Sequence, residues 1–71
     1  MGMKTTTKTL PLYTIRSRAA YIAPGGMVAV LATDDGQWEV WERQASGYYA
    51  GSGAIPYRWA AEKCANMRAA E

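Results

Sequence analysis

The sequence predicts an α+β domain in which a three- to four-stranded antiparallel sheet carries one C-terminal helix on one face. Two observations favour this class. Short stretches rich in β-branched and aromatic residues, separated by glycine-containing turns, fill the first two thirds of the chain. From Pro56 onward alanine, glutamate, lysine, arginine and methionine dominate, as is typical of a helix. Because 71 residues bury only one thin core, we expect a single domain over residues 1–71, with residues 1–8 as a flexible N-terminal arm.

The first predicted element is an edge strand over residues 9–16. Apolar and β-branched side chains alternate along this stretch with a period of two, and Pro11 marks an edge position because it cannot donate to a neighbouring strand. Residues 17–23 fit either a continuation of this strand or one short turn. The Pro-Gly-Gly sequence at 24–26 ends this segment, whether it is a strand or a turn.

The centre of the sheet is predicted at residues 27–32, a short apolar run that suits a strand covered on both faces. The Asp-Asp-Gly sequence at 34–36 tolerates positive φ and joins this strand to the next one, at 37–43, as a hairpin. A fourth short strand is expected at 47–50.

A C-terminal helix is predicted over residues 56–70, because proline suits a first helical turn. Steps of 100° per residue put five side chains on the stripe that should pack on the sheet: Tyr57, Ala60, Ala61, Cys64 and Met67. Cys64 then reads as a small buried hydrophobe and not as a reactive thiol.

The residues that catalysis needs are scarce. Histidine, the usual base near neutral pH, is absent, and the lone Cys64 cannot form an internal disulfide. Asp34 and Asp35 are turn residues, whereas Glu39 and Glu42, three positions apart on a strand, point to opposite faces and cannot share a proton or a metal. We therefore expect no catalytic residues, no cofactor and no metal site.

Hydropathy and charge give two further expectations. No apolar run reaches the roughly 18 residues of a membrane span, and the N-terminal stretch has no apolar core of a secretory signal, so we expect a cytoplasmic protein with no membrane partner.

The net charge is only +2, but the first quarter of the chain carries basic residues and no acid. These residues either contact phosphates of a nucleic acid or merely solubilise the terminus: Lys4, Lys8, Arg16 and Arg18.

The aromatic residues suggest a binding surface. Trp38 shares a strand face with Val40, whereas Trp41 lies on the opposite face with Arg43, so only the first tryptophan is expected in the core. Trp59 falls on the polar side of the predicted helix. Exposed tryptophans are over-represented among residues that anchor protein interfaces, although in so small a domain they also lie half-buried at the core rim. The expected partner-binding residues are Trp41, Trp59, Tyr48, Tyr49 and Arg43.

One helix can cover only one face of a sheet whose central strand is apolar on both. Two arrangements would cover the other face. Either the N-terminal segment folds over it, or two copies pair through it as a homodimer and bury Trp41 in a symmetric interface.

From Asp35 to Ala70 the sequence resembles two kinds of small β-β-β-α domain, on the strength of residues 36–40 (Gly-Gln-Trp-Glu-Val), a further short strand and an alanine-rich helix with Trp59. One is the DNA-binding module of phage-type integrases and plant AP2-like factors, whose sheet lies in the major groove. The resemblance places its DNA contacts at Glu39, Trp41, Arg43 and Tyr48 or Tyr49, although glutamates repel phosphate. The other is the group of very short proteins of phages and mobile elements that includes anti-CRISPR proteins. That resemblance lies in size and build and transfers no residue.

The function expected from the sequence is that of a non-enzymatic protein-binding module, an anti-CRISPR-like inhibitor or accessory protein that docks on a larger complex. The alternative is a small DNA-binding module that uses the exposed sheet face and the basic N-terminal arm.

Overall fold

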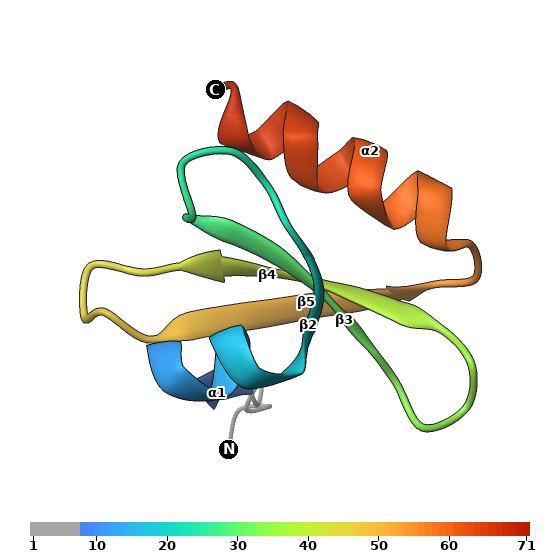
Figure 1. The fold of residues 1–71 in the computed structure, drawn as a ribbon, viewed down its shortest axis with the longest axis horizontal. Helices are drawn as coiled ribbons and strands as arrows, with labels where there is room; N and C mark the ends of the chain where they lie inside the picture. Colours follow the sequence, from blue (N-terminus) through green and yellow to red (C-terminus); the bar gives the residue numbers. More distant parts are fainter. Residues whose placement is uncertain (1–7) are drawn as a thin grey trace, which may run out of the picture.

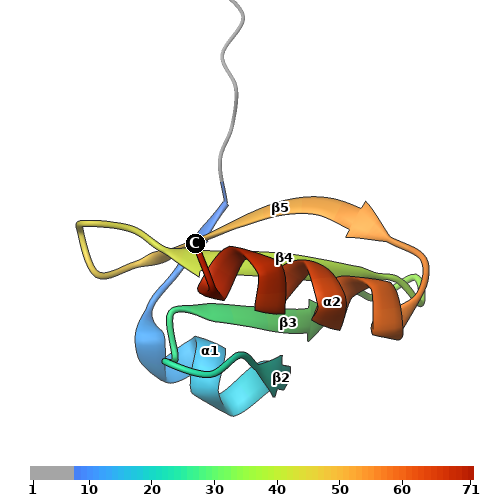
Figure 2. The ribbon, with the colours of Figure 1, turned by 90° about the horizontal axis from the view of Figure 1, so that it is seen from above.

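The computed structural model describes residues 8–71 and has a five-stranded antiparallel sheet between two helices (Figure 1). The strand order is β1-β5-β4-β3-β2. Helix α2 lies on one face of the sheet and the short helix α1 on the other, as Figures 1 and 2 show together. In chain order the elements are β1 (Thr9–Leu10), α1 (Leu12–Arg18), β2 (Ala19–Ile22), β3 (Val28–Ala32), β4 (Trp38–Arg43), β5 (Tyr49–Ile55) and α2 (Arg58–Ala69).

The structure confirms the α+β class and the C-terminal helix, and the sheet has five strands where three or four were expected. The prediction of one strand over residues 9–16 is wrong. Only Thr9–Leu10 pairs with β5, and the carbonyl of Pro11 then accepts hydrogen bonds from the amides of Thr14 and Ile15, both at 3.1 Å, which begins α1. Proline ends the strand because it has no N–H for the ladder, and its φ of −75° suits a helix start.

The ambiguous stretch 17–23 divides between two elements. Helix α1 ends at Arg18, and Ala19–Ile22 forms β2, which pairs with β3 through an irregular register between Ala19 and Tyr21. With this additional strand the centre of the sheet is β4, and β3, which was predicted as the centre, lies one position away from it.

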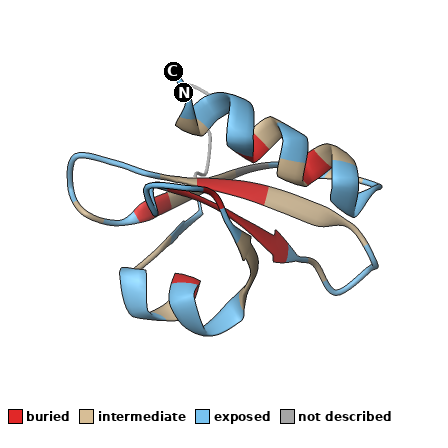
Figure 3. Cartoon of the chain, turned by 45° about the horizontal axis from the view of Figure 1, so that its top comes forward, coloured by how far each residue is buried: buried red, intermediate tan, exposed pale blue. Residues whose placement is uncertain are grey.

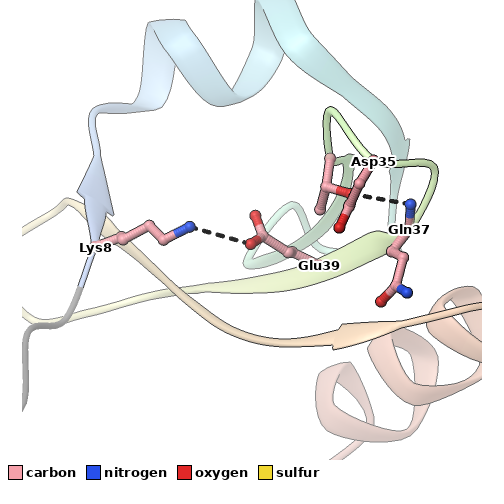
Figure 4. A network of polar contacts seen from close by, with 5 residues as sticks. Lys8, Asp35, Gln37 and Glu39 are labelled. Atoms are coloured by element: carbon pink, nitrogen blue, oxygen red, sulfur yellow. Dashed lines mark hydrogen bonds and ion pairs between the residues drawn. The ribbon is translucent and has the colours of Figure 1, made fainter.

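The predicted hairpin between β3 and β4 is confirmed. Val30 lies opposite Val40, and Gly36 adopts the left-handed conformation, with φ of 85°, that the tight turn requires. The amide of Thr33 donates to the carbonyl of Gln37 at 2.8 Å and closes the turn, and the Gln37 amide donates to Thr33 Oγ1 at 2.9 Å (Figure 4). The turn residues Asp34 and Asp35 are exposed, as their interpretation as turn residues requires.

The first core cluster lies between α2 and the sheet. Ala61 and Ala65 of the helix are fully buried, and their small side chains let the helix backbone lie close to the strands (Figure 3). The predicted stripe is therefore partly wrong: Tyr57 and Met67 are both 60% exposed, whereas Cys64 is half-buried against the cluster. The buried members are Ala23, Val28, Val30, Val40, Ala61 and Ala65.

A second core cluster lies on the opposite face, under α1. Ile15 is the buried residue of α1, and its side chain packs in this cluster. Its members are Ile15, Ala29, Leu31, Trp41 and Tyr49, with Leu10 and Ala19 packed against them. Of the two arrangements that the sequence allows for this face, the structure has the first: the N-terminal segment folds over it. The face therefore does not require a second copy of the chain to cover it.

Candidate interaction surfaces

The side of α2 that faces away from the sheet carries the largest exposed aromatic surface of the helix. Trp59, Lys63 and Met67 follow one another at intervals of four residues, on the side of the helix opposite Ala61 and Ala65. Trp59 is 67% exposed, and its ring stacks on that of Tyr57, with centroids 6.2 Å apart and planes 20° apart. These four residues, Tyr57, Trp59, Lys63 and Met67, are called the α2 patch below.

A shallow cavity of about 320 Å³ runs along this helix face. Trp59 and Met67 border it at positions about 12 Å apart along the helix axis. Its remaining lining residues are Ala60, Lys63, Cys64, Arg68 and Glu71. The cavity is thus apolar along its length, with two cations and one carboxylate beside it.

The rotation of α2 that turns Trp59 outward is fixed by contacts that a neighbouring side of the helix makes with the sheet. The guanidinium of Arg58 lies 5.6 Å from the ring centroid of Trp38, donates to Glu62 at 2.7 Å, and also donates to the carbonyl of Ala20 on β2 at 2.9 Å. Two turns later the hydroxyl of Tyr21 donates to Asn66 Oδ1 at 2.7 Å. These contacts hold residues 58, 62 and 66 toward β2, on the side of the helix that lies between the buried alanines and the α2 patch.

Two of the five predicted partner-binding residues are buried, which corrects those predictions. Trp41 is 3% exposed and Tyr49 is 2% exposed, because α1 covers the face on which both lie. The hydroxyl of Tyr49 donates to the carbonyl of Gly26 at 2.6 Å, so its polar atom also serves the fold. Neither side chain therefore exposes the area that an interface anchor needs.

The other three predicted residues are exposed, but the structure does not bring them together. Trp59 lies on α2. Tyr48 lies in the turn before β5, and Arg43 ends β4 with its side chain at a cavity on the α1 side. Trp38, predicted in the core, is half-buried beside the first cluster. The surface suggested by the sequence therefore divides into separate parts, of which the α2 patch holds the most exposed aromatic area.

The predicted nucleic-acid contacts also separate. Arg16 and Arg18 are exposed on α1, whereas Lys8 pairs with Glu39 at 3.3 Å across the sheet (Figure 4). That pair neutralises the glutamate expected on the outward sheet face. Lys4 and the remainder of the predicted arm, residues 1–7, lie outside the described residues.

A second cavity, of about 310 Å³, lies between α1, the β2–β3 turn and the end of β4. Five of its lining side chains are apolar or aromatic and two are arginines, Arg16 and Arg43. Sequence reasoning missed it, because α1 was expected as a strand and its residues could not then be placed beside the turn. The lining consists of Leu12, Ile15, Arg16, Ile22, Gly25, Gly26, Met27, Arg43 and Tyr49.

Within residues 8–71, no three Cys, Asp or Glu side chains lie close enough together to hold a metal ion. In the same part of the chain, no helix has the length and apolar character needed to cross a membrane. No protein-family model matches the sequence, and comparisons with curated proteins and with solved structures return no match.

Proposed function

We propose that the chain is a non-enzymatic protein-binding module that docks on a larger protein through the α2 patch. The observation that carries this proposal is the 67% exposure of Trp59, which stacks on Tyr57, itself 60% exposed. Exposing two large aromatic rings costs free energy that a monomer recovers only when a partner covers them, and tryptophan and tyrosine are the residues most enriched among interface anchors. The proposed setting is that of an inhibitor or accessory protein encoded by a phage or mobile element.

The chemistry of the partner follows from that of the patch. Trp59 and Met67 offer apolar area for an apolar ridge or side chain. Lys63 has no ion-pair partner among the residues that the structure describes, whereas Arg68 is held by Glu42 at 3.4 Å. A protein surface with an apolar centre and an acidic rim near Lys63 complements this arrangement.

The alternative, a DNA-binding module, receives less support from the geometry. Its sheet-face contacts at Trp41 and Tyr49 are covered by α1, and Glu39 is engaged by Lys8. The exposed arginines of α1 could still meet phosphates. Such binding would weaken steeply with added salt, whereas docking through aromatic anchors depends on salt much less.

The test uses a photoreactive amino acid at position 63 in the full chain, and the same group at position 13 as a matched control. Tyr13 is 76% exposed and lies on α1, on the other side of the sheet from α2. We expect irradiation in a lysate of the source cells to link one protein to position 63 and not to position 13. The linked protein is then purified and titrated against the wild-type chain, Trp59→Ala and Tyr13→Ala.

The proposal predicts at least a tenfold weaker affinity for Trp59→Ala, as an interface anchor typically gives, and an unchanged affinity for Tyr13→Ala. Equal affinities of the three proteins would refute it. If position 63 is linked only to a second copy of this chain, the α2 patch mediates self-association and does not bind a different protein. Binding of a random DNA duplex that disappears with salt and ignores Trp59→Ala would favour the alternative.

A further inference from the structure

The cavity beside α1 has the features of a small-ligand site, and these features are independent of the α2 patch. Its volume of about 310 Å³ lies at the lower end of the range for ligand pockets. Leu12, Ile22 and Met27 in its lining are 37%, 42% and 47% exposed, so apolar surface remains open to water there. Deeper lining residues, Ile15 and Tyr49, are buried and belong to the second core cluster.

The charged residues that line this cavity are both basic. Arg16 reaches it from α1 and Arg43 from the end of β4, and its lining contains no acidic residue. Neither guanidinium has a hydrogen-bond or ion-pair partner among the described residues, in contrast to Arg58 and Arg68, which both bind glutamates. Two unpaired guanidiniums beside an apolar wall are suited to an anion that carries an apolar chain, because arginine binds carboxylate oxygens through paired N–H groups.

The walls of the cavity are held in place by the fold. The Tyr49 hydroxyl donates to the carbonyl of Gly26 at 2.6 Å, which ties the β2–β3 turn to β5. The amide of Arg43 donates to the carbonyl of Met27 at 2.8 Å, which fixes the end of β4 beside the same turn. A ligand would therefore meet a largely formed site, and less of its binding free energy would be lost in ordering the protein.

We propose that this cavity binds a carboxylate carried on a short apolar chain, with Arg16 and Arg43 on the carboxylate and the apolar chain against Leu12, Ile22 and Met27. Two sources share this chemistry: a free medium-chain fatty acid, and the C-terminal residue of a peptide that ends in an apolar side chain. Both present one carboxylate and a few methylene or methyl groups, which is what a cavity of this size accommodates.

The experiment is a titration of the full chain with octanoate, followed by the backbone amide signals in two-dimensional NMR spectra at fixed ionic strength. Octanol supplies the apolar chain without the charge, and acetate supplies the charge without the chain. A short peptide ending in leucine is titrated in two forms, with a free and with an amidated C-terminus. We expect saturable shifts at residues 12–16 and 25–27 with octanoate or with the free-acid peptide, with a dissociation constant on the order of 1 mM for so few atoms.

Three variants locate the site: Arg16→Gln, Arg43→Gln and, as the matched control, Arg18→Gln. Arg18 is exposed on the same helix but does not line this cavity. The proposal predicts at least fivefold weaker octanoate binding for each of the first two variants and unchanged binding for the control, all three with dispersed spectra of a folded chain. Equal shifts with octanoate and octanol would overturn the proposal, and so would the absence of shifts with both octanoate and the free-acid peptide. An equal loss of octanoate affinity in all three variants would also overturn it. Whichever of octanoate and the free-acid peptide binds more tightly identifies the source.

Discussion

The indole ring of Trp41 lies against the backbone of Gly51, the residue directly opposite it on β5. A methyl group added at position 51 would come closer than 3.0 Å to three atoms of that ring. Gly51 does not adopt a positive φ, so the ring and not the backbone conformation requires a glycine here. The pair lets a tryptophan lie flat over the sheet, under α1, and so completes the second core cluster.

Gly51→Ala should therefore destabilise the protein through overpacking, by about 1–3 kcal/mol in the free energy of unfolding. Urea denaturation followed by circular dichroism measures this loss. The control is the same substitution in a Trp41→Leu background, where the ring is gone and the cost of the added methyl should shrink by about 1 kcal/mol or more. An equal cost in the two backgrounds would contradict the contact.

The two tryptophans that the sequence treated alike should respond differently to truncation. Trp41→Ala removes a buried ring and should lower the free energy of unfolding by about 3–5 kcal/mol. Trp59→Ala should change it by no more than about 0.5 kcal/mol, because most of that ring is in solvent and alanine favours a helix. Thermal and urea unfolding of both variants provide the comparison, and a large loss for Trp59→Ala would mean that its ring supports the fold.

A milder substitution at position 41 tests a detail of the same ring. Trp41 Nε1 is buried and has no hydrogen-bond partner among the described residues. Trp41→Phe removes ring area but also removes this unpaired donor, whose burial costs about 1–3 kcal/mol. We expect a stability loss at least 1 kcal/mol smaller than that of Trp41→Leu, which gives up more packing for the same gain. Because both variants lack the indole N–H, equal losses in urea denaturation would indicate that an aromatic ring at position 41 adds no packing beyond that of leucine.

The hairpin and the C-terminal helix were predictable because each is determined locally. The turn at 34–36 needs a residue with positive φ, which Gly36 supplies, and the alanine-rich segment has helical propensity without help from the sheet. Helix α1 was not predictable in this way. Residues 9–16 alternate as a strand does, but Leu12 and Ile15 are also spaced as a helical pair, and the available space on the sheet decides between the two patterns.

The candidate site follows the same division. The exposure of Trp59 was predictable, since its position on the helix follows from the helical repeat alone. The burial of Trp41 and Tyr49 was not, because it depends on a helix that comes from another part of the chain. The cavity with Arg16 and Arg43 joins residues 27 positions apart and exists only once α1 is placed.

The hydroxyl of Tyr49 provides a test of the bond that ties the β2–β3 turn to β5. Tyr49→Phe removes the donor to the Gly26 carbonyl and should lower the free energy of unfolding by about 1 kcal/mol. Tyr48→Phe is the matched control: its side chain is half-exposed, and the change should be within about 0.5 kcal/mol. Amide exchange at residues 25–27 should also accelerate in the first variant only. Similar exchange in the two variants would show that the hydroxyl does not hold the turn.

Arg58 is expected to contribute more than an ordinary surface arginine, because one guanidinium contacts the Trp38 ring, Glu62 and the Ala20 carbonyl. Its side chain is half-exposed, so solvent screening limits the total, and Arg58→Ala should cost about 1 kcal/mol. Arg68→Ala, which removes a single exposed ion pair at 3.4 Å, should cost no more than about 0.5 kcal/mol.

Arg58→Lys separates the contributions of the Arg58 contacts, since lysine keeps a charge for Glu62 but lacks the planar fork that also reaches β2. If the lysine variant unfolds at the same urea concentration as the wild type, the ion pair alone accounts for the effect, and the contacts with Trp38 and β2 do not set the rotation of α2.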